Sequence, residues 1–240
     1  MRQVPRYLLI GNGRISRHFQ HYFSLLQLPY SCWHRQQPIA QLEHELQHAS
    51  HVLILIRDQA IEAYAATHLR HSPALRIHFS GSLITDQAFG AHPLSSFSES
   101  LWSLDQYQKV PFILDHDAPD FEKLLPGLPN PHVRLHKSFK PKYHALCVLS
   151  GNFTCLLWQK FFTHLTQEFH IPTAMAYPFL QQITQNLLLH PEKALTGPLV
   201  RNDVETIEKN LRALEADPYQ EVYQSFVQCY QKMMEENEHE

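Results

Sequence analysis

Short apolar runs alternate with stretches of helical spacing over the first 135 residues of the chain. In the helix-like stretches apolar residues recur every three or four positions, as Ile61, Ala65 and Leu69 do. A run that is apolar throughout, such as residues 52–56, is typical of a strand in a parallel sheet covered by helices on both faces. The pattern therefore predicts a parallel α/β domain over residues 1–136. Strands are expected at residues 7–10, 30–33, 51–56, 76–79, 112–114 and 133–135, and helices at residues 15–26, 39–47 and 59–69.

The pattern changes after the proline-rich stretch 126–131 and becomes helical to the end of the chain. The helix near residue 203 has an apolar stripe formed by Val204, Ile207 and Leu211, and the spacing of Asn202 and Glu205 resembles a capping box. An all-helical second domain is expected over residues 137–240. Its helices are expected at residues 141–167, 173–189, from 202 or 203 onward, and 218–234.

A glycine turn directly follows the first expected strand. Gly11 permits a tight turn, Gly13 lets the backbone approach a pyrophosphate, and the helix that begins there offers free N–H groups. Ser16 stands where the third glycine of the dinucleotide-binding pattern G-x-G-x-x-G is usual, and it is small enough for close helix–strand packing. The turn favours a Rossmann-type domain, although an ordinary strand–helix turn has the same form. The residues expected to bind the cofactor here are Gly11, Asn12, Gly13, Arg14 and Ile15.

The end of the second strand indicates which dinucleotide is bound. NAD enzymes commonly place a carboxylate there to hold the ribose hydroxyls, but this chain has none before Glu43. His34 and Arg35 occupy the position instead, and their charge suits the additional phosphate of NADP. We therefore expect NADP as the cofactor. The alternative for Arg35 is a loop arginine that faces only solvent.

Two loops after later strands add candidate ligand contacts, because ligands bind at the carboxyl ends of parallel strands. Asp58 is expected to cap the third helix and, with Ser80, to lie near the cofactor. His92, in an expected loop, is a candidate for substrate binding. Ser80 can also be explained by turn chemistry, and His92 by packing within its loop.

The first helix of the second domain carries three polar residues among apolar ones. At 100° per residue, Lys140, His144 and Asn152 fall within a sector of about 120°. Polar groups on an apolar helix need partners, and a cleft that holds a polar ligand would supply them. Packing against the first domain or against a second copy of the chain is the alternative.

Several motifs together resemble a known family, the Rossmann-like proteins with a C-terminal domain of unknown function 2520. This family is similar to the pyrroline-5-carboxylate, ketopantoate and β-hydroxyacid reductases. The chain departs from the family's usual pattern at Ser16, Arg57 and Asn202. The resemblance is carried by Gly11-x-Gly13-Arg14, Asp58-x-x-Ile61, His78-x-Ser80-Gly81, His92-Pro93, Tyr143-His144 with Asn152, and Ala194-Leu-Thr-Gly-Pro198-x-x-Arg201-x-Asp203.

The resemblance implies that a lysine and an asparagine on the first helix of the second domain serve the substrate, with Lys140 and Asn152 as the nearest candidates. His144 is the better candidate for acid–base catalysis, because an imidazole titrates near neutral pH. Thr196 is expected to help orient the substrate, and Arg201 is expected to form a structural ion pair with Asp203. The function expected is hydride transfer between NADPH and a carbonyl or imine carbon of a small polar metabolite. The alternative is a catalytically inactive NADP-binding sensor or regulatory protein.

Composition limits the other possibilities. The net charge of −3 and the absence of basic clusters favour neither nucleic acid nor an anionic membrane as a partner. The four cysteines have no C-x-x-C spacing and no apolar run is long enough to span a membrane, so a cytoplasmic protein is expected. The 18 histidines are scattered without an H-E-x-x-H arrangement, so no metal site is expected, although a histidine-rich metal-binding protein is a further alternative.

The long helix at residues 141–167 is apolar on more sides than one face can bury. A symmetric partner is the commonest way to cover such a helix. We therefore expect a homodimer through the C-terminal helices. The residues concerned are Leu146, Val148, Leu149, Phe153, Leu156, Leu157, Trp158, Phe161 and Phe162.

Overall fold

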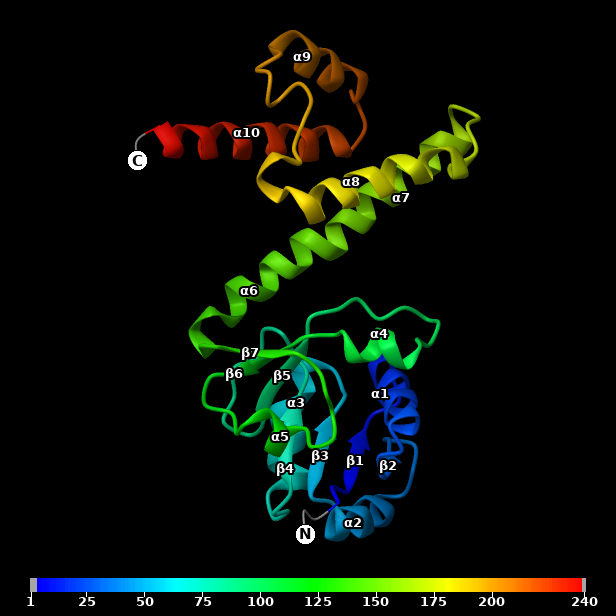
Figure 1. The fold of residues 1–240 in the computed structure, drawn as a ribbon, viewed down its shortest axis with the longest axis vertical. Coiled ribbons are helices and arrows are strands. Elements are labelled where there is room, and N and C mark those ends of the chain that lie inside the picture. Colours follow the sequence, from blue (N-terminus) through cyan, green and yellow to red (C-terminus); the bar gives the residue numbers. More distant parts are fainter. Residues whose placement is uncertain (1–3, 239–240) are drawn as a thin grey trace. The chain divides into compact units, whose positions relative to one another are not determined.

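A computed structural model describes residues 4–238 of the chain, which divides after Leu157 into two compact units (Figure 1). The first unit holds the sheet and the beginning of the long helix, and the second unit is helical. The domain boundary expected after residue 136 falls just behind the last strand. The first compact unit extends beyond it into the helix that follows.

One seven-stranded sheet forms the centre of the first unit, with the strand order β2-β1-β3-β4-β5-β6-β7. All neighbouring strands run parallel except β5 and β6, which are antiparallel. The Rossmann-type fold predicted from the sequence is thereby confirmed. The strands are β1 (Tyr7–Ile10), β2 (Tyr30–Trp33), β3 (His51–Ile54), β4 (Leu75–His78), β5 (Phe89–Pro93), β6 (Phe112–Asp115) and β7 (His132–Leu135).

The strand β5 is not among the strands expected from the sequence. The expectation of a loop around His92 was wrong, because His92 lies in β5 and pairs with Ile113 of β6. Gly90 and Pro93 obscure the strand, since both residue types are uncommon within strands. Pro93 is tolerated at the end of the strand, and Gly90 leaves space for side chains from other elements.

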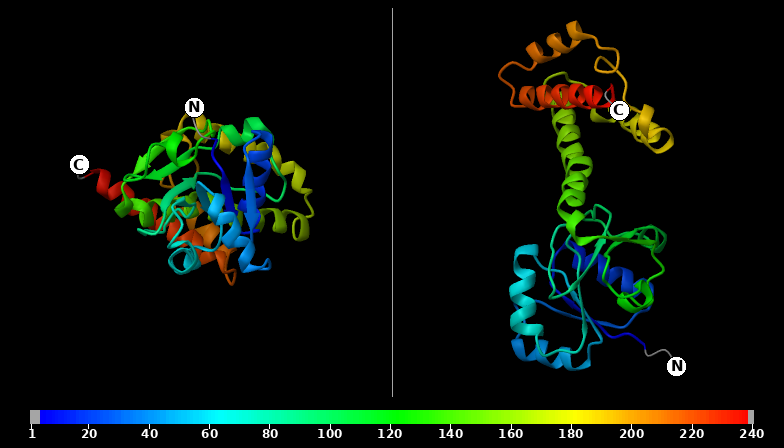
Figure 2. Two further views of the ribbon diagram at one scale, coloured as in Figure 1. Left: turned by 90° about the horizontal axis from the view of Figure 1, so that it is seen from below. Right: turned by 90° about the vertical axis from the view of Figure 1, so that its left-hand side faces the viewer.

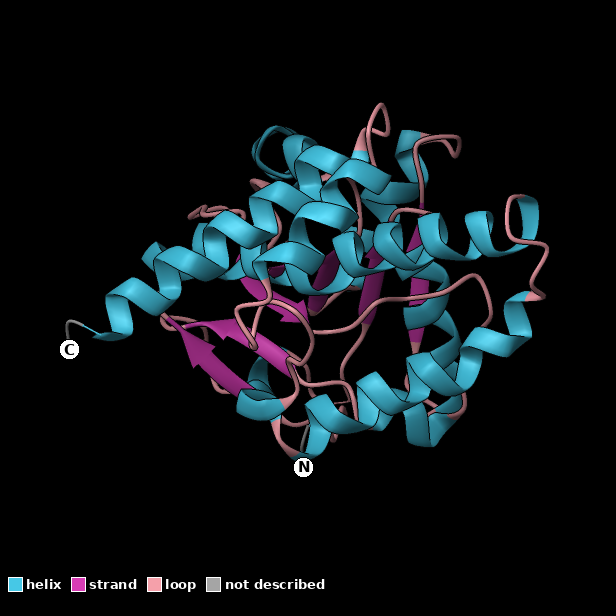
Figure 3. Cartoon of the chain, turned by 90° about the horizontal axis from the view of Figure 1, so that it is seen from above, coloured by secondary structure: helices cyan, strands magenta, loops and turns pink. Residues whose placement is uncertain are grey.

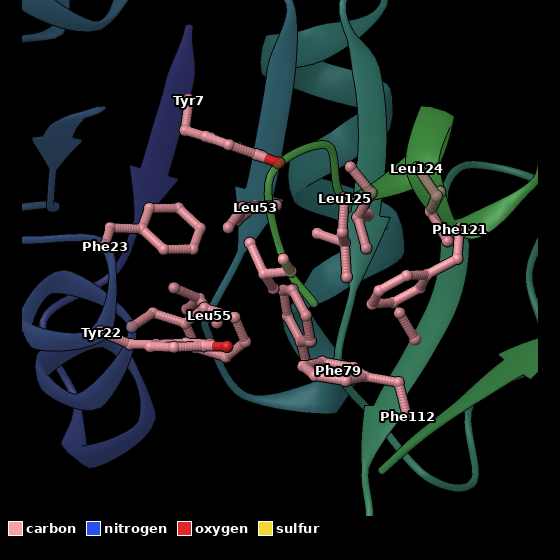
Figure 4. Packing of buried hydrophobic residues seen from close by; sticks show 14 of the residues in the cluster. Tyr7, Tyr22, Phe23, Leu53, Leu55, Phe79, Phe112, Phe121, Leu124 and Leu125 are labelled. Carbon is pink, nitrogen blue, oxygen red and sulfur yellow. The ribbon is translucent and has the colours of Figure 1, made fainter. Parts of the chain in front are cut away.

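Helices cover both faces of the sheet (Figure 2). Successive side chains of a strand point to opposite faces, so Tyr7 and Leu9 of β1 enter one core, and Leu8 and Ile10 enter the other. Figure 4 shows the first core, in which Phe23 and other aromatic rings pack over the strands. Its helices are α1 (Arg14–Leu25), α4 (Leu104–Gln108) and α5 (Phe121–Leu124), and the opposite face is covered by α2 (Ile39–His48) and by α3 (Asp58–Tyr64) with its π-helical extension η1 (Ala65–Leu69).

The long helix expected at residues 141–167 is present but is not regular. A short 3-10 turn, η2 (Lys137–Phe139), leads into α6 (Lys140–Cys147), and α7 (Thr154–Gln167) follows after the π-helical stretch η3 (Val148–Phe153). A π-helix turns by less than 100° per residue because its hydrogen bonds span five residues instead of four. The sector that was expected to align Asn152 with Lys140 and His144 therefore does not apply beyond Cys147.

The second unit continues with helices alone among its described residues (Figure 3). Lys160 of α7 forms an ion pair with Asp217, just before α10, and lies over the ring of Tyr219. The elements after α7 are η4 (Thr173–Ala176), α8 (Tyr177–Leu189), η5 (Pro191–Lys193), α9 (Val204–Ala213) and α10 (Tyr219–Glu238). Among residues 4–238, no helix combines the length and the apolar character that a membrane span requires.

The start of α9 corrects two expectations. Asp203, and not Asn202, is the N-cap, because its carboxylate accepts a hydrogen bond from the backbone N–H of Thr206 at 3.1 Å. The same carboxylate also accepts a hydrogen bond from the Thr206 hydroxyl at 2.8 Å. The ion pair expected between Arg201 and Asp203 is not among those formed by the described residues.

Candidate functional site

The glycine turn lies where the strand order reverses, since β1 has β2 on one side and β3 on the other. Gly11 has a φ of +127°, and a Cβ atom there would lie 2.3 Å from the carbonyl oxygen of Leu55. Only glycine fits this conformation and this close approach. In open parallel sheets, ligands bind at the carboxyl ends of the strands beside such a switch point. The turn is therefore placed where a dinucleotide binds in Rossmann-type folds.

The amino end of α1 is open to a ligand. Gly13 is its N-cap, no side chain caps the helix, and a Cβ atom on Gly13 would meet no atom within 4 Å. The first N–H groups of α1 thus have room for an anion in front of them. Ser16 is fully buried and donates its hydroxyl to the carbonyl oxygen of Gly11 at 2.8 Å. The serine therefore fits the packing in place of the usual third glycine.

Arg14 and Arg17 share one carboxylate beside this helix end. The Nε of Arg14 donates to Glu99 at 2.9 Å, and a terminal nitrogen of Arg17 donates to its other oxygen at 2.7 Å. All three side chains are more than half exposed. The sequence indicated Arg14 as a cofactor ligand but not Arg17 or Glu99, because Glu99 comes from a loop more than 80 residues away.

His34 and Arg35 follow β2 in a turn. The backbone N–H of His34 donates to the side chain of Gln37 at 2.8 Å, which shapes this turn. Arg35 is exposed, and within residues 4–238 its guanidinium makes neither a hydrogen bond nor an ion pair. An unengaged guanidinium at this position is free to bind a phosphate.

Asp58 and Ser80 contact each other. The Ser80 hydroxyl donates to the Asp58 carboxylate and accepts the backbone N–H of Leu83 at 3.0 Å. The expectation that Asp58 caps α3 was wrong, because Arg57 is the N-cap and Asp58 is already the first helical residue. The turn chemistry considered for Ser80 is thus present, and a role of either residue toward the cofactor stays a prediction.

Two histidines meet at Gly81, just beyond the carboxyl end of β4, and a tyrosine contacts one of them. A Cβ atom on Gly81 would lie 2.5 Å from Cδ2 of His144 and 3.1 Å from Nε2 of His92. The other ring nitrogen of His92, Nδ1, lies 2.8 Å from the hydroxyl of Tyr143. The rings of His92 and His144 are 6.0 Å apart and nearly perpendicular. The structure therefore brings together two residues that the sequence indicated separately, and it adds Tyr143, whose signal was its place beside His144 in the same motif.

A buried ion pair lies next to this cluster. Nζ of Lys140 is 2.7 Å from the carboxylate of Asp115, and the two side chains are only 5% and 2% exposed. Asp115 also accepts the backbone N–H of Gly90 at 2.8 Å, and a Cβ atom on Gly90 would lie 2.6 Å from the lysine nitrogen. Gly90 thus makes room for the pair. Lys140 was expected to face a polar ligand, whereas its Nζ forms an ion pair with Asp115. The sequence did not indicate Asp115 as its partner.

The imidazoles near the ion pair are held neutral. Burial lowers the pKa of His78 to about 4, and the charge of Lys140 lowers it further. Burial likewise lowers the pKa of His92 to about 4, with additional contributions from His144 and Lys140. His78 is fully buried, its Nδ1 accepts the backbone N–H of Ser80 at 3.3 Å, and its Nε2 has no protein partner among the described residues.

The remaining candidates are not part of this cluster. Asn152 is exposed within the π-helical stretch, and Thr196 is exposed in the second unit. Their roles stay predictions. Among the described residues no group of three or more histidine, cysteine, aspartate or glutamate side chains could hold a metal ion.

Solved structures with the same fold include three whose names describe an oxidoreductase or reductase. A candidate NADP oxidoreductase from Bacteroides fragilis is 17% identical, covers 95% of this chain and 98% of its own, and gives a TM-score of 0.74. A reductive aminase from Aspergillus terreus, in complex with NADPH and ethyl levulinate, is 16% identical with coverages of 98% and 95% and a TM-score of 0.57. Pyrroline carboxylate reductase from Plasmodium falciparum, with NADP bound, is 9% identical with coverages of 94% and 96% and a TM-score of 0.58.

At these identities the likeness shows the fold. No curated protein matches the chain in sequence. Residues 115–229, however, match the family model of the domain of unknown function DUF2520. This match includes Lys140, Tyr143 and His144 and confirms the resemblance noted in the sequence. The chain thus has a Rossmann-type sheet in its N-terminal region, and its C-terminal region is similar to the DUF2520 family over residues 115–229.

Proposed function

We propose that this protein is an NADP-dependent oxidoreductase that transfers a hydride between NADPH and a carbonyl or imine carbon of a small polar metabolite. One observation carries the proposal. The glycine turn after β1 and the imidazole cluster at Gly81 after β4 lie at the same edge of the sheet, because β1, β3 and β4 run parallel. An anion-binding turn and a cluster of titratable groups at that edge are what a dinucleotide-dependent reaction requires.

The cofactor is assigned to the residues that have room for it. The backbone N–H groups at residues 12–15 would bind the pyrophosphate, because no side chain caps α1 and the space before Gly13 is open. Arg35 would bind the additional phosphate of NADP, with His34 beside it. The same cofactor is present in the reductive aminase and in the pyrroline carboxylate reductase that share the fold.

The chemical step is assigned to the cluster at Gly81. NADPH, when bound, supplies the hydride. His144 would give a proton to the substrate oxygen or nitrogen, since its ring lies against Gly81 and is only partly buried. Lys140 would act as a positioning residue, because its ion pair with Asp115 fixes the start of α6 and therefore the place of His144 one turn later. Asn152 and Thr196 are proposed to orient the substrate.

We further propose a cytoplasmic homodimer that forms through the C-terminal helices. Leu146, Leu149 and Phe153 are each about half exposed, with values of 52%, 53% and 46%, and Leu156 is 49% exposed. Apolar residues of this size over several helical turns exceed what a monomer usually leaves uncovered. The four cysteines are all free thiols, as expected in a reducing compartment.

Cofactor binding at the glycine turn can be tested with matched glycine variants. Gly13→Leu and Gly151→Leu both place a side chain where the structure has open space, so both should fold. Only the first fills the phosphate site. Calorimetric titration should show NADPH affinity reduced by roughly 10- to 150-fold in Gly13→Leu, the effect of losing one or more charge-assisted hydrogen bonds. Equal affinity in both variants would refute this cofactor site.

A further inference from the structure

Two histidines of the first unit make the same contact with a tyrosine. Nδ1 of His18 lies 2.8 Å from the Tyr107 hydroxyl, and Nδ1 of His92 lies 2.8 Å from the Tyr143 hydroxyl. The opposite nitrogen of His18, Nε2, is 2.9 Å from the carbonyl oxygen of Ser98. A carbonyl oxygen can only accept, so Nε2 of His18 carries the hydrogen and Nδ1 accepts from the tyrosine. His18 therefore shows the proton arrangement of a complete tyrosine–histidine pair.

The same arrangement follows for His92 from acid and base strength. A phenol with a reference pKa of about 10 is a good donor, and an imidazole with a reference pKa of about 6.5 is the stronger acceptor. Burial raises the pKa of Tyr143, the neighbouring Cys147 thiol raises it further, and burial lowers the pKa of His92, so both groups are neutral at pH 7. The Tyr143 hydroxyl then donates to Nδ1 of His92, and the hydrogen of the ring lies on Nε2.

The Nε2–H of His92 differs from that of His18 in having no acceptor. Within residues 4–238 it makes no hydrogen bond, and it lies 3.1 Å from where a Cβ atom of Gly81 would be. The charged and titratable groups around the ring are Tyr143, His144 and Lys140 from α6 and Asp58 from α3. Since Gly81 has no side chain, this nitrogen and the ring of His144 both lie against the backbone at Gly81.

We propose that His92 is a second catalytic residue, which donates its Nε2–H to the carbonyl oxygen of the substrate, and that Tyr143 is the positioning residue that fixes this tautomer. The assignment rests on the proposed function and narrows its substrate class to ketones and aldehydes. A carbonyl oxygen accepts the donor, whereas the N–H of a protonated imine is itself a donor and would oppose it. A neutral imidazole is a known form of electrophilic catalyst.

In the proposed step His144 supplies the proton and His92 stabilises the oxyanion. The hydride forms a new C–H bond at the carbonyl carbon, the π electrons of C=O move to the oxygen, and NADPH is oxidised to NADP⁺. The oxygen takes its proton from the imidazolium form of His144, which becomes neutral. His92 keeps its proton throughout and stabilises the developing oxyanion. The product is an alcohol.

The tautomer can be measured without a substrate. Nitrogen-15 NMR of the full chain labelled at histidine reports which ring nitrogen carries hydrogen, and the signals of His92 are identified by their loss in His92→Gln. Between pH 6 and 8, His92 should be neutral with hydrogen on Nε2. Tyr143→Phe should mix the tautomers of His92 and leave His18 unchanged. A hydrogen on Nδ1, or a charged ring at pH 7, would overturn the proposal.

Turnover provides the second part of the test. The probes are a panel of 2-oxo acids, ketones and aldehydes, and the cyclic imine 1-pyrroline, each assayed by NADPH consumption. Carbonyl reduction should fall by about 10²- to 10³-fold in His92→Phe, the usual effect of losing one oxyanion donor, and His92→Gln should recover part of it through its amide N–H. Reduction of 1-pyrroline in preference to the carbonyl probes would overturn the substrate assignment. Failure of both probe classes would instead contradict the proposed function, on which the NMR result does not depend.

Discussion

Lys140→Met tests whether the ion pair between Lys140 and Asp115 is buried in the folded protein. The substitution keeps the length of the side chain but leaves the Asp115 carboxylate, which is 2% exposed, without its cation. Removing one partner of a buried pair costs about 3–5 kcal/mol of unfolding free energy, since an uncompensated charge remains in the interior. Lys109→Met is the matched control, because Lys109 and Asp105 are 74% and 73% exposed and such pairs contribute about 0–1 kcal/mol.

Urea unfolding of the unmodified protein, Lys140→Met and Lys109→Met, followed by circular dichroism, measures these differences in unfolding free energy. The double variant Lys140→Met/Asp115→Leu should recover most of the loss, because apolar residues commonly replace a buried pair without a large change in stability. About 1 kcal/mol should remain lost, since Asp115 also accepts the N–H of Gly90. If Lys140→Met destabilised the protein no more than Lys109→Met does, the buried ion pair between Lys140 and Asp115 would be refuted. A Lys140 side chain that faces the substrate would then explain the result better.

Four further results are expected. Arg35→Ala should narrow the preference for NADPH over NADH by roughly 10- to 150-fold, and equal affinities in the unmodified protein would exclude this role. Glu99→Gln should tighten NADPH binding by about 2- to 5-fold, because it releases the two arginines beside α1; unchanged affinity in calorimetry would contradict this. The unfolding free energy should fall as pH drops from 6.5 to 4, because His78 and His92 have pKa values of about 4 in the folded protein and take up protons more readily in the unfolded chain. Urea midpoints that rise toward low pH would refute this prediction. Light scattering at micromolar concentration should give a dimer mass, reduced in Phe153→Asp, and a monomer mass for the unmodified chain would refute the interface.

The parts of the fold that were predictable have strong local patterns. The run at residues 7–10 is apolar and ends in the glycine turn, and β1 has the bounds expected from it. By contrast, β5 contains Gly90 and Pro93, which both weaken a strand pattern, and it pairs antiparallel with β6. Its place is determined by contacts with distant strands, which no local pattern contains.

The site was predictable only one residue at a time. The sequence indicated His92 and His144 from motifs on separate segments, but the absence of a side chain at Gly81 is what lets their rings meet. Lys140 was placed on the ligand-facing side of a regular helix. The sequence could not show that Asp115, at the end of β6, would bind it across 25 residues.

Turnover by His144→Ala, measured together with NADPH affinity on the same protein, decides whether His144 is the proton donor of an NADPH-dependent reductase. NADPH should bind to His144→Ala within about 2-fold of the unmodified protein, because the phosphates are assigned to the glycine turn. Carbonyl-dependent NADPH consumption should fall by about 10²- to 10⁴-fold, the usual contribution of a positioned acid. His71→Ala, which removes an exposed histidine, should change neither quantity. Full activity in His144→Ala would contradict the assignment, and NADPH binding without turnover of any carbonyl compound would show a cofactor-binding sensor instead.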